Sequence, residues 1–185
     1  VIDSCDVCLL NTRFEPVHKT QTDSKGNYIL DKVEKGKYMG MYAIRSQEYP
    51  TRNLVSDEDK RLEYWAWNVI ADRNLEINPR YHRLELYGTN VFKIEGAYPG
   101  MIIYTRPMSL GKFLNHTDKD NPKVDVLSVL PEHLKIKVFA DEEELIINSV
   151  QPVMEYTGEN NAPIRAFLIS VSTPKNKPDK PYIIF

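Results

Sequence analysis

Apolar side chains at alternate positions, in runs short enough to be strands, recur along most of this chain. Such runs lie at residues 7–12, 27–33, 37–44, 62–70, 82–88, 90–94, 100–105, 133–140, 143–150, 165–171 and 182–185. Turn-forming residues interrupt them at 23–27, 33–37, 77–80, 98–100 and 157–161. Many short strands separated by turns are typical of β-sandwiches. The sequence therefore predicts an all-β fold, with a helix expected only at residues 56–62, where Ser56 can cap an acidic first turn.

The length of the chain bears on how many cores these strands can form. With 185 residues, 42% of them hydrophobic, the chain can bury one large core or two small ones. We predict two antiparallel β-sandwich domains, at residues 1–88 and 89–185, and the alternation after residue 88 favours an immunoglobulin-like second domain. The polar residues 111–125 are predicted to be an interdomain linker or a long loop within the second domain.

Residues 20–44 contain two polar corners, each followed by an apolar run. At the first corner we expect the Asp23 carboxylate to bond the local backbone while Gly26 or Asn27 takes a left-handed conformation. Glu34, Lys35 and Gly36 are expected to repeat this arrangement. The stretch is therefore predicted to be a three-stranded meander.

This stretch resembles the carboxypeptidase regulatory-like family of small prealbumin-type (transthyretin-like) β-sandwiches. The family motif runs T-x-T-D-x-x-G-x-[FY]-x-[LI], followed by a short loop and G-x-Y, and residues 75–88 resemble its closing strands. The usual first strand would lie before Val1 or be reduced to residues 1–4, and residues 46–74 resemble an insertion. The matching positions are Thr20, Thr22, Asp23, Gly26, Tyr28, Leu30, Gly36 and Tyr38.

The resemblance implies a cellular location. Tandem modules of this kind are common in secreted and envelope proteins of gut-type bacteria, often beside components for polysaccharide uptake. We therefore expect a periplasmic, outer-membrane-associated or extracellular protein whose partner is a polysaccharide or an envelope protein. Because the chain begins at Val1 without a methionine, we expect a processed chain, with membrane contact only through an N-terminal lipid anchor that would have preceded Val1.

Charge and hydropathy argue against two other kinds of partner. The formal net charge is -2, whereas proteins that neutralise many phosphates carry a basic excess. No stretch approaches the roughly 20 consecutive apolar residues that span a bilayer. Nucleic acid is therefore not expected as a partner.

The two cysteines, Cys5 and Cys8, lie three positions apart. An odd spacing along a strand directs side chains to opposite faces, so the two thiols are expected neither to bridge one another nor to share a metal ion. A tight turn would allow a redox-active pair or half of a zinc site, but no second CxxC or paired histidine follows. We predict structural cysteines.

The candidate ligand-binding residues are Tyr64, Trp65 and Trp67. The two tryptophans lie two positions apart and so share one face of a strand. If that face is exposed, the rings suit stacking against sugars or a partner's apolar surface. Apolar residues on both faces of this run instead favour burial in a core, and both interpretations stay open.

No catalytic motif is recognisable in the sequence. The four histidines are scattered, and neither a G-x-S-x-G elbow nor a glycine-rich phosphate loop occurs. A weak calcium candidate, Asp118, Asp120 and Asp125, lacks the glycine and the final glutamate of an EF-hand loop. We therefore predict a non-catalytic module without a cofactor; the alternative is a glycan hydrolase whose two carboxylates, about 5–10 Å apart, come together only in the fold. A binding module is expected to lack a cluster of titratable groups with shifted pKa values.

Overall fold

The structure is a computed structural model, and it describes residues 1–94, 96, 99–118 and 120–175. Within these ranges the chain is built mainly of antiparallel strands, which confirms the predicted all-β class. The strands are β1 (Asp6–Leu10), β2 (Pro16–Gln21), β3 (Gly36–Lys37), β4 (Gly40–Ile44), β5 (Tyr64–Trp67), β6 (Ile70–Ala71), β7 (Leu84–Phe92), β8 (Gly100–Ser109), β9 (Phe139–Ala140), β10 (Glu143–Glu144), β11 (Ile147–Glu155) and β12 (Ile164–Ser172). The helical segments are α1 (Leu110–Asn115) and the 3-10 turns Ser46–Glu48, Pro50–Arg52 and Pro131–His133.

The chain divides into two compact units. Unit 1 contains residues 1–86 and 109–114, and unit 2 contains residues 87–108 and 115–185. Strand β7 begins in unit 1 and continues into unit 2, while all of α1 except Asn115 belongs to unit 1. The polar stretch after residue 110 is thus partly a helix of unit 1, in contrast to the linker or loop predicted for residues 111–125.

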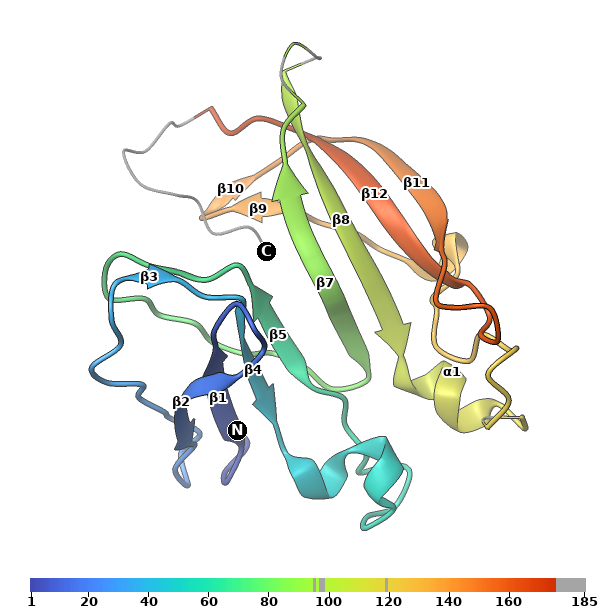
Figure 1. Cartoon of the computed structure of the whole chain (residues 1–185), viewed down its shortest axis with the longest axis horizontal. Coiled ribbons are helices and arrows are strands. Elements are labelled where there is room, and N and C mark those ends of the chain that lie inside the picture. Colours follow the sequence, from blue (N-terminus) through green and yellow to red (C-terminus); the bar gives the residue numbers. More distant parts are fainter. Residues whose placement is uncertain (95, 97–98, 119, 176–185) are drawn as a thin grey trace. The chain divides into compact units, whose positions relative to one another are not determined.

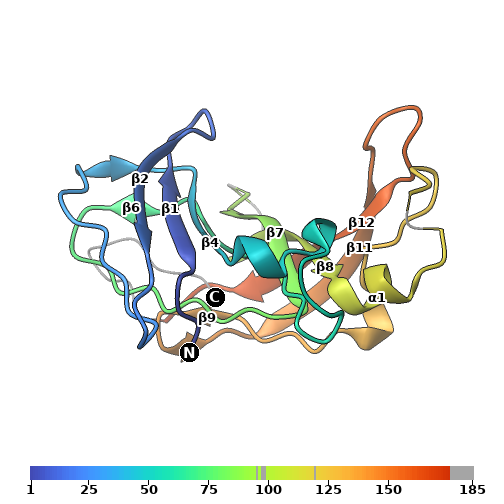
Figure 2. The same cartoon turned by 90° about the horizontal axis from the view of Figure 1, so that it is seen from below.

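Unit 1 is organised around a four-stranded sheet in the order β2-β1-β4-β5, with all neighbours antiparallel (Figure 1). Figure 2 shows β2, β1 and β4 of this sheet from another side. The register places Cys8 opposite Tyr42, and Tyr42 opposite Trp65. On the other face, Val7, Leu9, Met41 and Ala43 are buried. The opposite face is partly covered by its own side chains, since Cys8 on it is buried while Tyr42 and Trp65 are half-buried.

The covering layer over the buried face of this sheet is mostly irregular backbone. A two-residue ladder, β3-β6, forms part of it. The remainder comes from side chains of two loop segments and the N-terminal residues, which pack on the buried cluster: Ile2, Tyr28, Leu30, Val33, Leu75, Ile77 and Tyr81. The core of unit 1 therefore lies between a regular sheet and a layer of loops.

The Asp23 corner forms as predicted. Asp23 Oδ1 accepts hydrogen bonds from the backbone N–H groups of Lys25 and Asn27, both at 2.8 Å. Gly26 takes the left-handed conformation, with φ of 77°. These bonds, the one from Asn27 foremost, lower the pKa of Asp23 because they favour the carboxylate form.

The second corner and the meander were predicted wrongly. In the loop before β3 the left-handed residue is Lys32, with φ of 54°, and Gly36 instead begins β3. Residues 27–33 contain no strand; Tyr28 and Leu30 face the core from irregular backbone. The strand that was not predicted is β2, in which apolar and polar residues alternate less clearly. In the sheet, β1 lies between β2 and β4.

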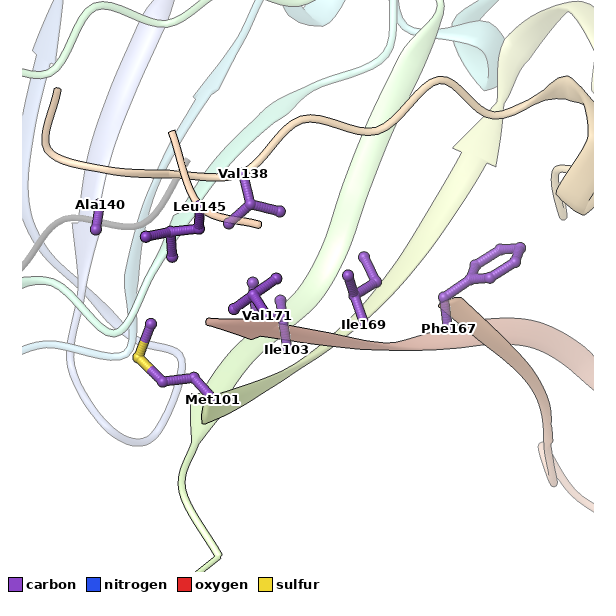
Figure 3. Close-up of a cluster of buried hydrophobic side chains, with 8 residues drawn as sticks. All are labelled: Met101, Ile103, Val138, Ala140, Leu145, Phe167, Ile169 and Val171. Carbon is purple, nitrogen blue, oxygen red and sulfur yellow. The ribbon is translucent and has the colours of Figure 1, made fainter. Parts of the chain in front are cut away.

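Unit 2 contains a four-stranded antiparallel sheet in the order β11-β12-β8-β7, and the hairpin β9-β10 (Figure 1). The buried cluster combines sheet residues with residues near the hairpin, and Figure 3 shows Val138 and Leu145 pointing toward the sheet residues. Its members are Met101, Ile103, Val138, Ala140, Leu145, Phe167, Ile169 and Val171. Of the run 133–140, only β9 pairs as a strand, although Leu134, Ile136 and Val138 still face the core.

The structure differs from some of the remaining predictions and does not describe the residues of others. Residues 56–62 are a turn and not a helix: Ser56 Oγ bonds Asp59 at 2.9 Å, and its carbonyl accepts from Asp59 and Lys60. The presumed insertion at 46–74 supplies β5, the edge strand of the unit 1 sheet. The run 182–185 and part of the turn at 98–100 lie outside the described residues. Within the described ranges, no helix is long and apolar enough to cross a bilayer.

Candidate functional site

The outer face of the unit 1 sheet, opposite the core, carries a row of aromatic rings. Trp65 and Trp67 stack with their ring centroids 4.6 Å apart and their planes 16° from parallel. Two indoles this close cannot lie side by side in one plane, so the rings overlap face to face. The predicted sharing of one face by the two tryptophans is therefore realised, and both rings are half-buried.

Two further rings extend this stack. Tyr42, directly across from Trp65 on β4, has its ring centroid 5.3 Å from that of Trp65 at a tilt of 37°. Phe14, in the loop between β1 and β2, meets Trp67 edge-on with centroids 6.2 Å apart. We call Phe14, Tyr42, Trp65 and Trp67 the aromatic row.

The backbone at Phe14 is unusual. Its φ is 62°, a left-handed value that is rare for a bulky side chain and costs energy on the order of 1–3 kcal/mol. The loop is held by Asn11, whose Oδ1 accepts from the N–H groups of Arg13 and Glu15 at 2.9 and 3.0 Å. This loop geometry presents the Phe14 ring to Trp67.

The polar edges of both indoles are satisfied within unit 1. Trp65 Nε1 donates to Glu63 Oε1 at 2.8 Å, and Trp67 Nε1 donates to the Leu86 carbonyl at 3.2 Å. Burial raises the pKa of Glu63, and the bond from Trp65 opposes this rise. What the aromatic row offers a ligand is therefore apolar ring surface rather than ring N–H groups.

Tyr64, the third predicted binding residue, lies apart from the tryptophans. It faces the core side of β5 and packs against the buried cluster of unit 1. Burial raises the pKa of its hydroxyl. The structure thus brings Trp65 and Trp67 together and places Tyr64 on the opposite face of the sheet.

A polar cluster lies on the core side of unit 1. Cys5 Sγ and the Tyr81 hydroxyl are 3.0 Å apart in a hydrogen bond that either group can donate. Arg61 lies over the Tyr81 ring, 5.8 Å from its centroid, and its Nε donates to Glu48 Oε2 at 2.8 Å. Arg45 bonds the other oxygen of Glu48 at 2.9 Å.

The electrostatics of this cluster do not activate the thiol. Burial raises the pKa of Cys5, and the hydrogen bond with Tyr81 only partly opposes that rise. A reactive cysteine needs a lowered pKa, because the thiolate is the nucleophile. Both cysteines are free and buried, and Cys8 lies on the opposite sheet face from Cys5, as the spacing predicted.

Buried tyrosines predict a dependence of stability on alkaline pH. Burial raises the pKa of Tyr28 to about 12, and its hydroxyl donates to the Ile77 carbonyl. Because an unfolded tyrosine titrates near about 10, this contribution to stability is complete below about pH 10 and is lost as pH rises toward about 12. We expect the urea unfolding midpoint to fall over that range, and to fall less steeply for Tyr28→Phe. Tyr156→Phe, at a position 74% exposed, is the matched control and should keep the wild-type slope; equal slopes for all three proteins would contradict the prediction.

The calcium candidates have local structural roles. Asp118 Oδ2 accepts from the Asn121 amide at 2.8 Å, and Asp125 Oδ1 accepts from the N–H groups of Leu127 and Ser128 at 3.0 and 2.9 Å. Asp120 is exposed. Among the residues that the structure describes, no group of three or more histidine, cysteine, aspartate or glutamate side chains is placed to hold a metal ion.

Phe14 and Tyr42 were missed because their contacts depend on strand pairing. Within residues 37–44, alternation places Tyr42 on the opposite face of the strand from Met41 and Ala43. Nothing in the sequence, however, gives the register of Tyr42 against Trp65.

No family model matches the sequence, and the comparisons with curated proteins and with solved structures find no match.

Proposed function

We propose that this chain is a non-catalytic binding module of a cell envelope or of the secreted space, and that the aromatic row contacts a polysaccharide or an apolar patch of an envelope protein. The aromatic row carries the proposal. It gathers four rings on the sheet face that the core of unit 1 does not use. Aromatic surface of this kind is typical of sugar-stacking sites and of protein interfaces.

The strained backbone at Phe14 supports this interpretation. A left-handed phenylalanine persists only where its surroundings hold it, and such residues cluster at binding sites and active sites. Phe14 is 48% exposed, so burial of its ring does not account for the conformation. The conformation belongs to the turn, in which the Phe14 N–H donates to the Asn11 carbonyl at 3.1 Å, and it places the ring beside Trp67.

The titratable groups do not meet the expectation for a binding module, because unit 1 contains a cluster with shifted pKa values and burial also raises the pKa of the Glu63 carboxyl. A general acid or base works best with a pKa near the operating pH. Here burial raises the pKa values of Cys5 and Tyr81, which form a cluster not expected from the sequence, and both groups stay protonated at neutral pH. Burial also raises the pKa of Tyr104 in unit 2 to about 12.

We further propose that unit 1 is a modified prealbumin-like sandwich of the carboxypeptidase regulatory-like type and that unit 2 is immunoglobulin-like. The motif residues of unit 1 have structural roles that support this. Thr22 Oγ1 accepts from the Cys5 N–H at 2.9 Å and donates to the Ile2 carbonyl at 2.8 Å, and Tyr28 faces the core. In unit 2, a hairpin beside a four-stranded sheet supports a layered arrangement.

Glycan binding by the full chain tests the proposal. On a glycan array we expect saturable binding to a polysaccharide class, weakened at least tenfold by the double substitution Trp65→Ala and Trp67→Ala, because about 1.5–3 kcal/mol accompanies burial of a large apolar side chain. Leu54→Ala with Leu84→Ala is the control, since these side chains of unit 1 are 67% and 47% exposed and lie outside the row. The control should bind like wild type.

The outcomes separate the alternatives. Wild-type binding by the tryptophan variant would exclude the aromatic row as the binding site. Release of reducing sugar from the bound glycan would replace the binding module with a hydrolase. If no glycan binds, the polysaccharide part of the proposal is wrong, and crosslinking to envelope proteins through a photoreactive residue at Phe14 tests the remaining part.

A further inference from the structure

Two carboxylates lie beside the aromatic row on the outer face of the unit 1 sheet. Asp6 precedes Cys8 by two positions on β1, so alternation places it on the same face as Cys8. Glu63 precedes Trp65 by two positions and is hydrogen-bonded to it. Burial is the main cause that raises the pKa of the Tyr42 hydroxyl, and the charges of Asp6 and Glu63 add to this rise. Both carboxylates are therefore close to Tyr42.

The Glu63 carboxylate uses one of its two oxygens within the protein. Oε1 accepts a hydrogen bond from Trp65 Nε1 at 2.8 Å, which holds the indole in its orientation within the row. In the part of the chain that the structure describes, Oε2 has neither a hydrogen bond nor an ion pair. It is also not one of the enclosed polar atoms that lack a partner, so this oxygen reaches the surface. A free carboxylate oxygen thus lies next to the Trp65 ring.

The other charged groups on this face leave an excess of acceptors. Asp6 Oδ1 accepts from Gln21 Nε2 at 2.7 Å, and Oδ2 has no hydrogen bond among the described residues. The register of β1 and β2 places Lys19 on the same face, where it is exposed. The ion pair of Arg13 with Glu15 adds no net charge. Two carboxylates and one ammonium group give the face beside the row a net negative charge.

These groups distinguish among the ligands of the aromatic row. A sugar hydroxyl can donate to a carboxylate oxygen, and such charge-assisted bonds are stronger than bonds between neutral groups. A uronic acid or a sulfate group instead brings another negative charge toward Glu63 and Asp6, which is unfavourable. An apolar protein patch would cover the free oxygen of Glu63 without offering a donor, and burial of an unpartnered carboxylate is costly. The chemistry of this face therefore fits a neutral sugar best.

We propose that Glu63 makes the aromatic row selective for neutral polysaccharides, with Oε1 orienting Trp65 and Oε2 accepting a hydrogen bond from a sugar hydroxyl. Asp6 offers a second acceptor. Binding is reversible and involves no covalent step. This inference rests on the proposed function and narrows its ligand from a polysaccharide or an envelope protein to a neutral glycan.

Tryptophan fluorescence of the full chain measures binding directly, because both tryptophans of the sequence belong to the aromatic row. We expect the glycans that bind on an array to be neutral. The tightest of them is titrated at pH 8, well above the range in which glutamate carboxyls ordinarily titrate, and is compared with its own carboxymethylated form. The carboxymethylated form should bind at least about tenfold more weakly, and this difference should shrink as salt is added. Equal affinities, or tighter binding of the carboxymethylated form, would overturn the inference and leave the aromatic row as the binding site.

A matched pair of variants assigns the selectivity to Glu63. Glu63→Gln removes the charge but keeps an oxygen that can accept from Trp65 Nε1, so the near-ultraviolet circular dichroism of the stacked indoles should stay unchanged. This variant should weaken binding of the neutral glycan about fivefold and reduce the preference over the carboxymethylated form to less than about threefold. Glu34→Gln makes the same charge change at an exposed carboxyl in the loop before β3, and it should bind both forms like wild type.

The outcomes separate this inference from the proposed function. A wild-type preference in Glu63→Gln would show that Glu63 does not determine selectivity, even where the double tryptophan variant loses binding. Equal loss of preference in Glu34→Gln would show a general charge effect and contradict the role of Glu63. If no glycan binds, the polysaccharide part of the proposed function fails together with this inference. The comparison of the two glycan forms on wild type needs no variant.

Discussion

Replacing Gly40 with alanine is expected to lower the free energy of unfolding by about 2–3 kcal/mol. Gly40 lies in β4 between Leu10 of β1 and Trp67 of β5. A Cβ atom at this position would lie 2.8 Å from the Ala66 carbonyl oxygen. Because that oxygen belongs to the backbone of β5, no side-chain rotation relieves the clash. The strands would have to move apart, which also disturbs Trp67 and the aromatic row.

Gly36 provides the matched control for this prediction. It also lies in a strand of unit 1, β3, but a Cβ there would meet no atom within 4 Å. Gly36→Ala should therefore be neutral or should raise stability by about 0.4–1 kcal/mol through the unfolded state. Urea unfolding followed by far-ultraviolet circular dichroism measures both variants, and similar stabilities for the two would show that the close approach at Gly40 is not a constraint.

The sequence predicts those parts of the fold that depend on neighbouring residues. The all-β class follows from the alternation, and the corner at Asp23 follows from an aspartate followed by a glycine, since the hydrogen bonds of the carboxylate reach residues within the turn. Strand pairing involves residues far apart in sequence. Residues 27–33 have strand-like alternation yet pair with nothing, because packing of Tyr28 and Leu30 on the core, and not a ladder, fixes them.

The candidate site shows the same limit. Spacing of two places Trp65 and Trp67 on one face of β5, and this holds in the structure. Which face is outward is not evident from the strand itself, because the alternate set, Tyr64 and Ala66, is also apolar. Only the register against Met41 and Tyr42 decides it.

Replacing Phe167 with alanine is expected to have the largest effect on stability, about 3–5 kcal/mol. Phe167 is 0% exposed and belongs to β12, which pairs with both β11 and β8, so strands on either side restrict collapse around the vacated space. Its ring stands on the same side of the sheet as Ile169 and Val171 (Figure 3). The loss of stability has two parts: the free energy that burial of the phenyl group contributed, and the cost of the cavity left behind.

A more exposed phenylalanine tests whether burial of the ring, rather than removal of any aromatic ring, causes the loss of stability. Phe92 in β7 is 40% exposed, and Phe92→Ala should cost roughly 0.5–1 kcal/mol. Phe167→Leu keeps most of the apolar volume and should cost less than about half as much as the alanine variant. Thermal and urea unfolding of the three variants give the ranking. A cost for Phe167→Ala no larger than that for Phe92→Ala would place the core of unit 2 elsewhere, because the Phe167 ring is fully enclosed in the buried cluster and water cannot replace its lost contacts.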